Sequence, residues 1–211
     1  MKKIFINNMS GLILIAAFAL VGSSCQKEQV LKTNLNEADV QSMLSDANAS
    51  AVSACTGPIP EILKVPAGNK LVLQTYATGV QIYQVKRSTV DTNSFSWVGV
   101  APLATVYAKP DFTNQLALHY AGPSWEFTKG QFKGEKVVGV KEQGITVDLT
   151  AVQWLRLKAV DSLSSPGNKI TYIQRVCTSG GLPPTTPANA GNVGTLDSIP
   201  YTTAYFFYTK S

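Results

Sequence analysis

Histidine and cysteine are scarce in this sequence, which holds one histidine and three cysteines among 211 residues. A zinc site of the usual make-up needs several such ligands, and with no Cys-x-x-Cys pair we expect no metal. The D-x-D-x-D-G loop of calcium sites is also missing. After Cys55 there is no G-x-G-x-x-G turn between a strand and a helix, which a nicotinamide dehydrogenase needs. We therefore expect no cofactor.

Charged residues make up only 15 % of the chain, with a formal net charge of +5. Removal of Lys2 and Lys3 with the targeting segment described next lowers this charge to about +3, and the remaining basic residues are scattered. A nucleic-acid surface requires a clustered basic stripe, so this class of partner is not expected.

The start of the chain, residues 1–24, reads as a signal peptide. Lys2 and Lys3 are followed by an apolar run at 11–21 and by small residues at 22–24, directly before Cys25. The apolar run is shorter than the ~20 residues that span a bilayer. We therefore expect cleavage, with no part in the fold.

Small residues before Cys25 resemble a bacterial lipobox, in which the cysteine is acylated, for instance by palmitate. The resemblance departs at Gly22, where leucine is usual; ordinary cleavage that leaves a free Cys25 is the alternative. Several acyl chains hold a protein firmly to a membrane leaflet. No aspartate follows the cysteine, which favours the outer membrane of the bacterial cell envelope, facing either the periplasm or the surface.

Between the anchor and the main domain we expect a lipidated tether at residues 25–35 and one helix at 36–54. Asn34 with Glu37 three residues later forms a capping pattern, and apolar residues recur at helical spacing after it. The helix must end before Gly57 and Pro58.

From Leu63 onward the hydrophobic periodicity changes to two, which predicts a β domain over residues 60–211. Alternation over residues 154–159 predicts that Leu155, Leu157 and Ala159 face inward. Turn signals at Thr78-Gly79 and Lys129-Gly130 suit antiparallel hairpins. We expect a mainly β fold, a single antiparallel β-sandwich or closed β-barrel of about ten strands with one N-terminal helix. The expected strands are 70–77, 80–86, 95–100, 104–108, 115–121, 124–128, 135–141, 152–160, 169–177 and 202–208.

Residues 178–196 contain many glycines and prolines and no strand-forming run. A loop longer than about 12–15 residues without structure of its own is usually a functional lid or disordered. Both alternatives stay open for this segment.

The octapeptide from His119 to Glu126 brings the only histidine, Trp125 and a carboxylate to one Gly-Pro turn. His119 could act as a general base with Glu126 as its partner, which predicts a hydrolase-like enzyme. The alternative is a hydrogen-bonded structural histidine beside packed aromatic residues. No Gly-x-Ser-x-Gly elbow surrounds Ser124, so a serine triad is not supported.

Amide and aromatic side chains recur on shared strand faces, because side chains alternate along a strand. If these faces converge, they form a concavity suited to a sugar or another polar small molecule; otherwise they tile an exposed sheet. The candidate ligand-binding residues are Gln81, Tyr83, Trp97, Tyr120, Trp125, Tyr172 and Gln174.

Several motifs follow one another along residues 60–208: 65–70 (VPAGNK), 79–83 (GVQIY), Trp97 with Ala101-Pro102, 119–126 (HYAGPSWE), 137–139 (VVG), 172–176 (YIQRV), Gly180-Gly181, and 200–208 (PYTTAYFFY). Together they resemble the domain of unknown function 3455 family. That family has no established activity, and a malate dehydrogenase label on some fungal members is not transferable without a dinucleotide-binding motif.

At Cys177 the sequence departs from the family that it resembles, in which asparagine is more common at this position. In an oxidising compartment Cys55 and Cys177 could form a disulfide, and only their distance decides whether they do. Two residues earlier, Arg175 shares a strand face with Ile173 and Cys177. If that face points inward, Arg175 needs a carboxylate partner, with Glu126 and Asp148 as candidates.

These observations favour a non-enzymatic, membrane-anchored envelope lipoprotein. Its β domain would bind a small molecule, a glycan or an envelope protein. The alternative is the hydrolase-like enzyme that uses Glu126 and His119.

Overall fold

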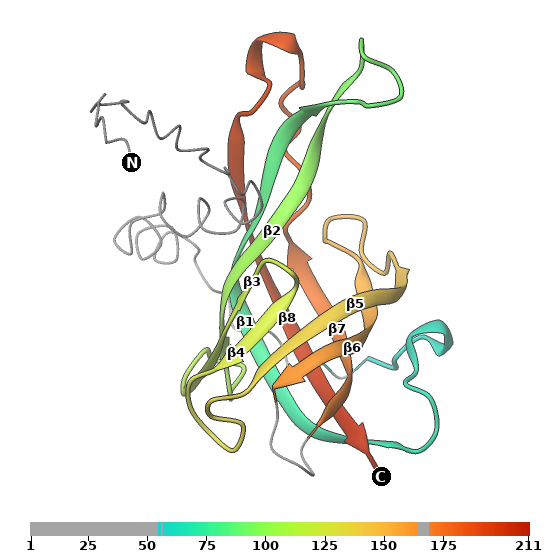
Figure 1. Ribbon diagram of the computed structural model, residues 1–211, viewed down its shortest axis with the longest axis vertical. Coiled ribbons are helices and arrows are strands. Elements are labelled where there is room, and N and C mark those ends of the chain that lie inside the picture. The colour runs from blue at the N-terminus through green and yellow to red at the C-terminus, as the bar shows by residue number, and fades with distance from the viewer. Residues whose placement is uncertain (1–54, 56, 164–168) are drawn as a thin grey trace, which may run out of the picture. The chain divides into compact units, whose positions relative to one another are not determined.

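The computed structural model describes residues 55, 57–163 and 169–211, without the side chains of 161–163. Eight strands follow one another, each antiparallel to the next, and β1 also pairs with β8, so that one sheet closes in a ring (Figure 1). The strands are β1 (Asn69–Arg87), β2 (Phe95–Tyr107), β3 (Gln115–Tyr120), β4 (Ser124–Phe127), β5 (Lys136–Ile145), β6 (Trp154–Leu163), β7 (Ile170–Gly180) and β8 (Leu196–Lys210).

The mainly β, antiparallel prediction is confirmed, and the single sheet closes instead of splitting into two facing sheets. The ring is uneven, because strand length ranges from 4 residues in β4 to 19 in β1. Strands expected at 70–77 and 80–86 are one strand, β1, and those expected at 95–100 and 104–108 are one strand, β2.

The turn expected at Thr78-Gly79 is wrong, because β1 runs through both residues. Both residues pair with β2 and β8 inside continuous β1. A Cβ atom at Gly79 would lie 2.2 Å from the carbonyl oxygen of Leu103. The glycine therefore permits a close approach of two backbones and does not turn the chain.

The inside of the ring holds the larger hydrophobic core, built from alternate residues of every strand. The inward alternation expected for Leu155, Leu157 and Ala159 on β6 is confirmed: Leu157 is buried in the core, and the other two pack against it. Aromatic side chains fill much of this space, among them Trp125, Phe127, Phe132, Tyr201, Tyr205 and Phe207.

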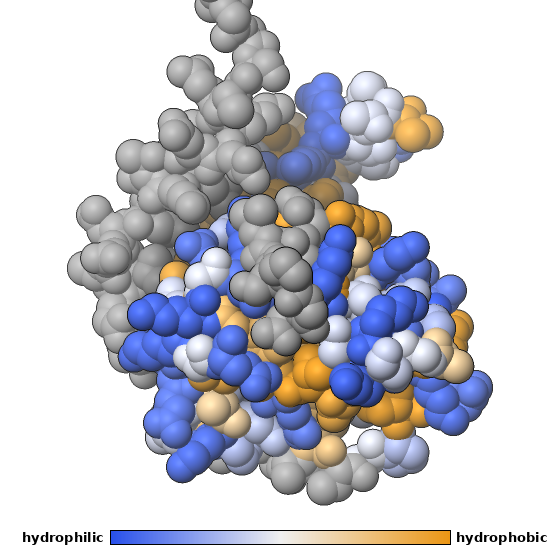
Figure 2. All heavy atoms as spheres, turned by 60° about the horizontal axis from the view of Figure 1, so that its bottom comes forward, coloured by the Kyte–Doolittle hydropathy of each residue, from blue (hydrophilic) through white to orange (hydrophobic). Residues whose placement is uncertain are grey.

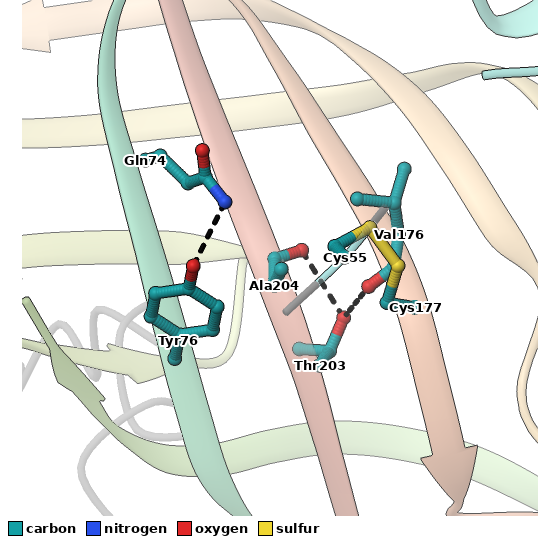
Figure 3. Close-up of a disulfide and its surroundings, with 7 residues drawn as sticks. All are labelled: Cys55, Gln74, Tyr76, Val176, Cys177, Thr203 and Ala204. Atoms are coloured by element: carbon teal, nitrogen blue, oxygen red, sulfur yellow. Dashed lines mark hydrogen bonds between the residues drawn. A yellow bond between two sulfur atoms is a disulfide. The ribbon is translucent and has the colours of Figure 1, made fainter. Parts of the chain in front are cut away.

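A second, smaller cluster lies on the outer faces of β7 and β8. The 3-10 helix η1 (Glu61–Leu63) covers it, with the Leu63 side chain fully buried. A disulfide joins Cys55 to Cys177 on β7, with Cα atoms 5.8 Å apart, and lies beside Thr203 and Ala204 of β8 (Figure 3). The covalent link thus holds the start of the described chain against this face.

The segment between β7 and β8, residues 181–195, is an ordered loop that includes the 3-10 helix η2 (Ala190–Asn192). Asn189 caps η2 through its side chain. The loop runs beside the far end of the β1–β2 hairpin (Figure 1), where the indole Nε1 of Trp97 donates to the Thr186 carbonyl at 2.7 Å. The Val85 N–H donates to the Thr195 carbonyl and the Gly194 N–H donates to the Val85 carbonyl, and these backbone bonds join the loop to β1.

The signal peptide (1–24), the tether (25–35) and the helix (36–54) lie outside the described residues. In the part of the chain that is described, both helices are short 3-10 turns. No helix there has the length and hydrophobicity that crossing a membrane requires.

Candidate functional site

A cavity of about 270 Å³ lies against the inner face of the ring. Residues from β1, β2, β3, β4, β6, β7 and β8 line it, although they are far apart in the sequence. Its apolar wall includes Ala101, Pro102, Pro123, Leu155 and Leu157. Its polar and aromatic lining comprises Gln81, His119, Trp125, Arg175 and Tyr205.

The β3–β4 hairpin places His119 and Trp125 side by side in the cavity. The two residues are direct cross-strand partners, so their side chains share the inner face. Their rings stack with centroids 4.4 Å apart, and the edge of Tyr205 packs against both. The tight turn that aligns them depends on Gly122, whose φ of 112° is one that L side chains rarely adopt.

His119 is held as a neutral imidazole. Its Nδ1 lies 2.8 Å from the carbonyl oxygen of Ser124, which can only accept, so Nδ1 carries the proton and Nε2 is the acceptor. The pKa of His119 is lowered to about 3, mainly by burial and to a smaller extent by the positive charge of Arg175, against the opposing hydrogen bond to Ser124. A base this weak is poorly suited to proton abstraction near neutral pH.

Arg175 is anchored by backbone acceptors and not by the carboxylate that the sequence led us to expect. Its Nε and Nη2 both donate to the carbonyl oxygen of Gln153, at 3.1 and 2.9 Å. Glu126 instead accepts from the Tyr120 hydroxyl, and Asp148 accepts from Thr150. Among the described side chains Arg175 forms no ion pair, so that expectation is wrong.

Tyr205, which lines the cavity, has a second buried tyrosine, Tyr201, as its neighbour. The hydroxyl groups of Tyr201 and Tyr205 lie 3.3 Å apart. Burial raises the pKa of both phenols, although the charge of Arg175 opposes the rise. Both tyrosines are therefore protonated and neutral at ordinary pH.

Two nitrogen donors at this site are buried without a hydrogen-bond acceptor among the described residues: Nε1 of Trp125 and Nε2 of Gln81. The Gln81 amide does lie near the Tyr201 hydroxyl and lowers the pKa of that phenol. Buried donors without partners are rare and costly, so the Trp125 indole beside the cavity favours a ligand that brings an acceptor.

The structure does not bring His119 and Glu126 together. Trp125 faces inward with His119, and the next residue, Glu126, faces outward and is exposed. Tyr120 also lies outside the cavity lining, where its hydroxyl donates to Glu126 at 2.7 Å and the Lys136 ammonium lies over its ring. Within the octapeptide, His119 and Trp125 therefore face the inside of the ring, whereas Tyr120 and Glu126 lie outside the cavity.

The other expected ligand-binding residues have structural partners elsewhere. Tyr83 donates to the Gly181 carbonyl, and Trp97 to the Thr186 carbonyl, so both hold the 181–195 loop. Gln174 faces the outer cluster, where it donates to the Leu63 carbonyl and accepts from Tyr208, and Tyr172 shares that outer face. Of the seven candidates, only Gln81 and Trp125 line the cavity.

Sequence reasoning missed Tyr205 as a site residue and did not place Arg175 in a cavity. For each of them, alternation along its strand was the available signal. Arg175 alternates with Ile173, which an inward strand face would bury, and Tyr205 alternates with Phe207 on β8.

Hydrophobic side chains also reach the outer surface, between hydrophilic ones, on the face drawn in Figure 2. The exposed large ones are spread over several strands and loops, and none belongs to the cavity lining. Scattered exposed apolar residues are normal for a soluble surface, so the cavity remains the better candidate. Examples are Val90, Val140, Leu149, Val160 and Val193.

Comparison with known proteins gives one finding. The profile of a family described as "Protein of unknown function (DUF3455)" matches residues 66–209, from just before β1 to the end of β8. Neither the curated proteins nor the solved structures contain a significant match to this chain.

Proposed function

Because this chain belongs to the family described as Protein of unknown function (DUF3455), whose description supplies no activity, we propose a function from the cavity itself. The protein is a non-enzymatic envelope lipoprotein, anchored through an acylated Cys25, whose β domain binds a small molecule inside the ring. The cavity at the ring's inner face is the observation that carries this proposal.

The lining supports binding without catalysis. A rigid closed sheet positions an aromatic wall and a small number of convergent polar groups, which is the usual make-up of a small-molecule site. The hydrolase alternative is not proposed, because His119 and Glu126 lie on opposite faces of the hairpin. Gln81 and Arg175 are partly exposed, so a ligand can reach the cavity from solvent.

The test is a thermal-shift screen of envelope glycans and small metabolites on the whole protein. A true ligand at 100 times its Kd should raise Tm by roughly 5–10 °C. Gly99→Leu serves as the blocked variant: Gly99 lines the cavity, and a Cβ there meets only the Tyr83 ring, at 3.6 Å. Gly57→Leu is the matched control, since a Cβ at exposed Gly57 meets no atom.

A compound that stabilises the wild type and Gly57→Leu but not Gly99→Leu supports the proposal. Compounds that stabilise Gly99→Leu as strongly as the wild type would place binding elsewhere. A screen in which no compound raises Tm would overturn the proposal.

A further inference from the structure

Among the described residues that line the cavity, Arg175 carries the only charged group. Arginine carries five N–H donors in a rigid fork. Two of its nitrogens, Nε and Nη2, donate to the Gln153 carbonyl, and the Tyr205 side chain also interacts with the guanidinium. Donors therefore remain free to bind an anion, and a planar fork is best matched by a carboxylate.

The arginine is held in place before any ligand arrives. The Val152 N–H donates to the Gly180 carbonyl, and the Thr178 hydroxyl donates to the Val152 carbonyl at 2.6 Å. These bonds fix the backbone at Gln153, to which Arg175 is bound. A pre-organised cation loses little freedom when it binds an anion.

The groups that face Arg175 are neutral. His119 is unprotonated at neutral pH, and both Tyr201 and Tyr205 keep their protons. The described lining thus has a net charge of one positive unit with nothing to offset it. The free Nε1 of Trp125 adds a further donor. One cation with apolar walls suits a monoanion better than a highly charged phosphate, which usually requires several charged donors.

The volume sets the size of the rest of the ligand. A cavity of about 150 Å³ accepts benzene. The 270 Å³ found here leaves room for one ring, or an aliphatic group of similar size, together with a carboxylate. Leu155, Leu157 and Pro123 supply an apolar surface for such a body.

We propose that the cavity binds a small organic monocarboxylate, with its carboxylate on Arg175 and its apolar body against Leu155, Leu157 and Pro123. This assignment rests on the proposed small-molecule binding and names the class of ligand.

The test measures binding of benzoate by calorimetry on the whole protein, beside its neutral analogue benzamide and inorganic phosphate. Benzoate should bind with a Kd tighter than ~1 mM, and benzamide and phosphate at least tenfold more weakly. Arg175→Gln should weaken benzoate binding by about 10- to 100-fold. Arg175→Lys, which keeps the charge, should weaken it less.

Arg87→Gln is the matched control, because this arginine is exposed, lies over the Phe95 ring and is absent from the cavity lining. It should leave benzoate affinity unchanged. Thermal unfolding of each variant shows whether it is folded. If Arg175→Gln does not fold, Arg175→Lys still tests whether the guanidinium binds benzoate.

Equal affinity for benzamide and benzoate, or equal loss in Arg87→Gln and Arg175→Gln, would overturn the carboxylate assignment. If both compounds bind and Gly99→Leu blocks both, the proposed small-molecule binding survives that failure. A Kd for benzoate weaker than ~1 mM, or tighter binding of phosphate than of benzoate, also overturns the assignment.

Discussion

His119 shows how one buried side chain can tie the stability of the ring to pH. Its imidazole is 2 % exposed, stacked on Trp125 and bonded through Nδ1 to Ser124. Protonation would place a second positive charge beside Arg175 inside the core. The folded protein therefore resists a proton that the unfolded chain accepts readily.

We expect acid to destabilise the protein through this residue. The pKa is about 3 in the folded state and 6.5 for an ordinary histidine, so the contribution is complete above pH 6.5 and declines as pH falls toward 3. At pH 5 the loss in the free energy of unfolding is about 2 kcal/mol. Urea unfolding of the wild type and His119→Asn between pH 7.5 and 5 measures it.

The informative quantity is the difference between the two proteins, because carboxylates affect both alike. The stability advantage of the wild type should shrink by about 2 kcal/mol over this range. If the free energies of unfolding of the two proteins change in parallel with pH, the folded protein accepts a proton on His119 as readily as the unfolded chain does.

At the scale of elements, the disulfide joins the segment before η1 to a bulge in β7. The register of β7 against β8 shifts between Val176 and Ser179, and Cys177 has a φ of 51°. A positive φ is uncommon for cysteine and better tolerated by asparagine. Asparagine, which the family resemblance leads us to expect at this position, would therefore suit this backbone. Cysteine adopts the same backbone with more strain, but it can form the disulfide.

Loss of the bridge should lower the free energy of unfolding by roughly 2–5 kcal/mol in Cys55→Ser, since the linked residues are 122 apart in sequence. The double variant Cys55→Ser with Cys177→Asn should regain about 0.5–1 kcal/mol by easing the backbone. Chemical denaturation under non-reducing conditions measures both. A double variant less stable than the single one would contradict the backbone argument.

The 181–195 loop should be loosened by a single substitution at Trp97. Trp97→Phe removes the Nε1 donor to Thr186 while keeping an aromatic ring on β2. We expect faster amide exchange in the loop with a global stability change of only about 0.5–1.5 kcal/mol. Val90→Ala, at the exposed β1–β2 turn, is the control. Unchanged exchange in the loop would show that other contacts hold it.

Strand type could be predicted from the sequence, and strand ends could not. Alternation over 154–159 gave the correct inner face of β6, because burial there follows side-chain direction alone. Gly79 was read as a turn, since local sequence does not reveal that Leu103 of another strand lies against it. The start of β8 was missed because Pro200 suggests a break, although it pairs with Val80 in β1.

The site was only partly predictable for the same reason. His119 and Trp125 lie on one hairpin, so spacing in the sequence brought them together. Arg175 and Tyr205 reach the same cavity from β7 and β8, and only the register of a closed ring unites them. Faces that looked equivalent locally, at Gln81 and at Gln174, point to opposite sides of the sheet.

For the whole molecule, the predicted anchor determines where the domain works. Cys25→Ser should move the protein from the membrane fraction to the soluble fraction, because the acyl chains proposed on Cys25 would provide the attachment. Fractionation followed by intact mass measurement tests this, with Cys55→Ser as a cysteine control outside the lipobox. Unchanged membrane association, or a wild-type mass without acyl chains, would contradict it.

The pairing of the first strand with the last has a consequence for how the chain acquires its structure. Asn69 pairs with Lys210, so the seam between β1 and β8 joins the two ends of the domain. Contacts between residues so distant in sequence slow folding. A chain that emerges from its N-terminus must wait for its final strand, with the edges of β1 and β7 open to aggregation in the meantime. The completion of β8 therefore controls when this domain stops being vulnerable to aggregation.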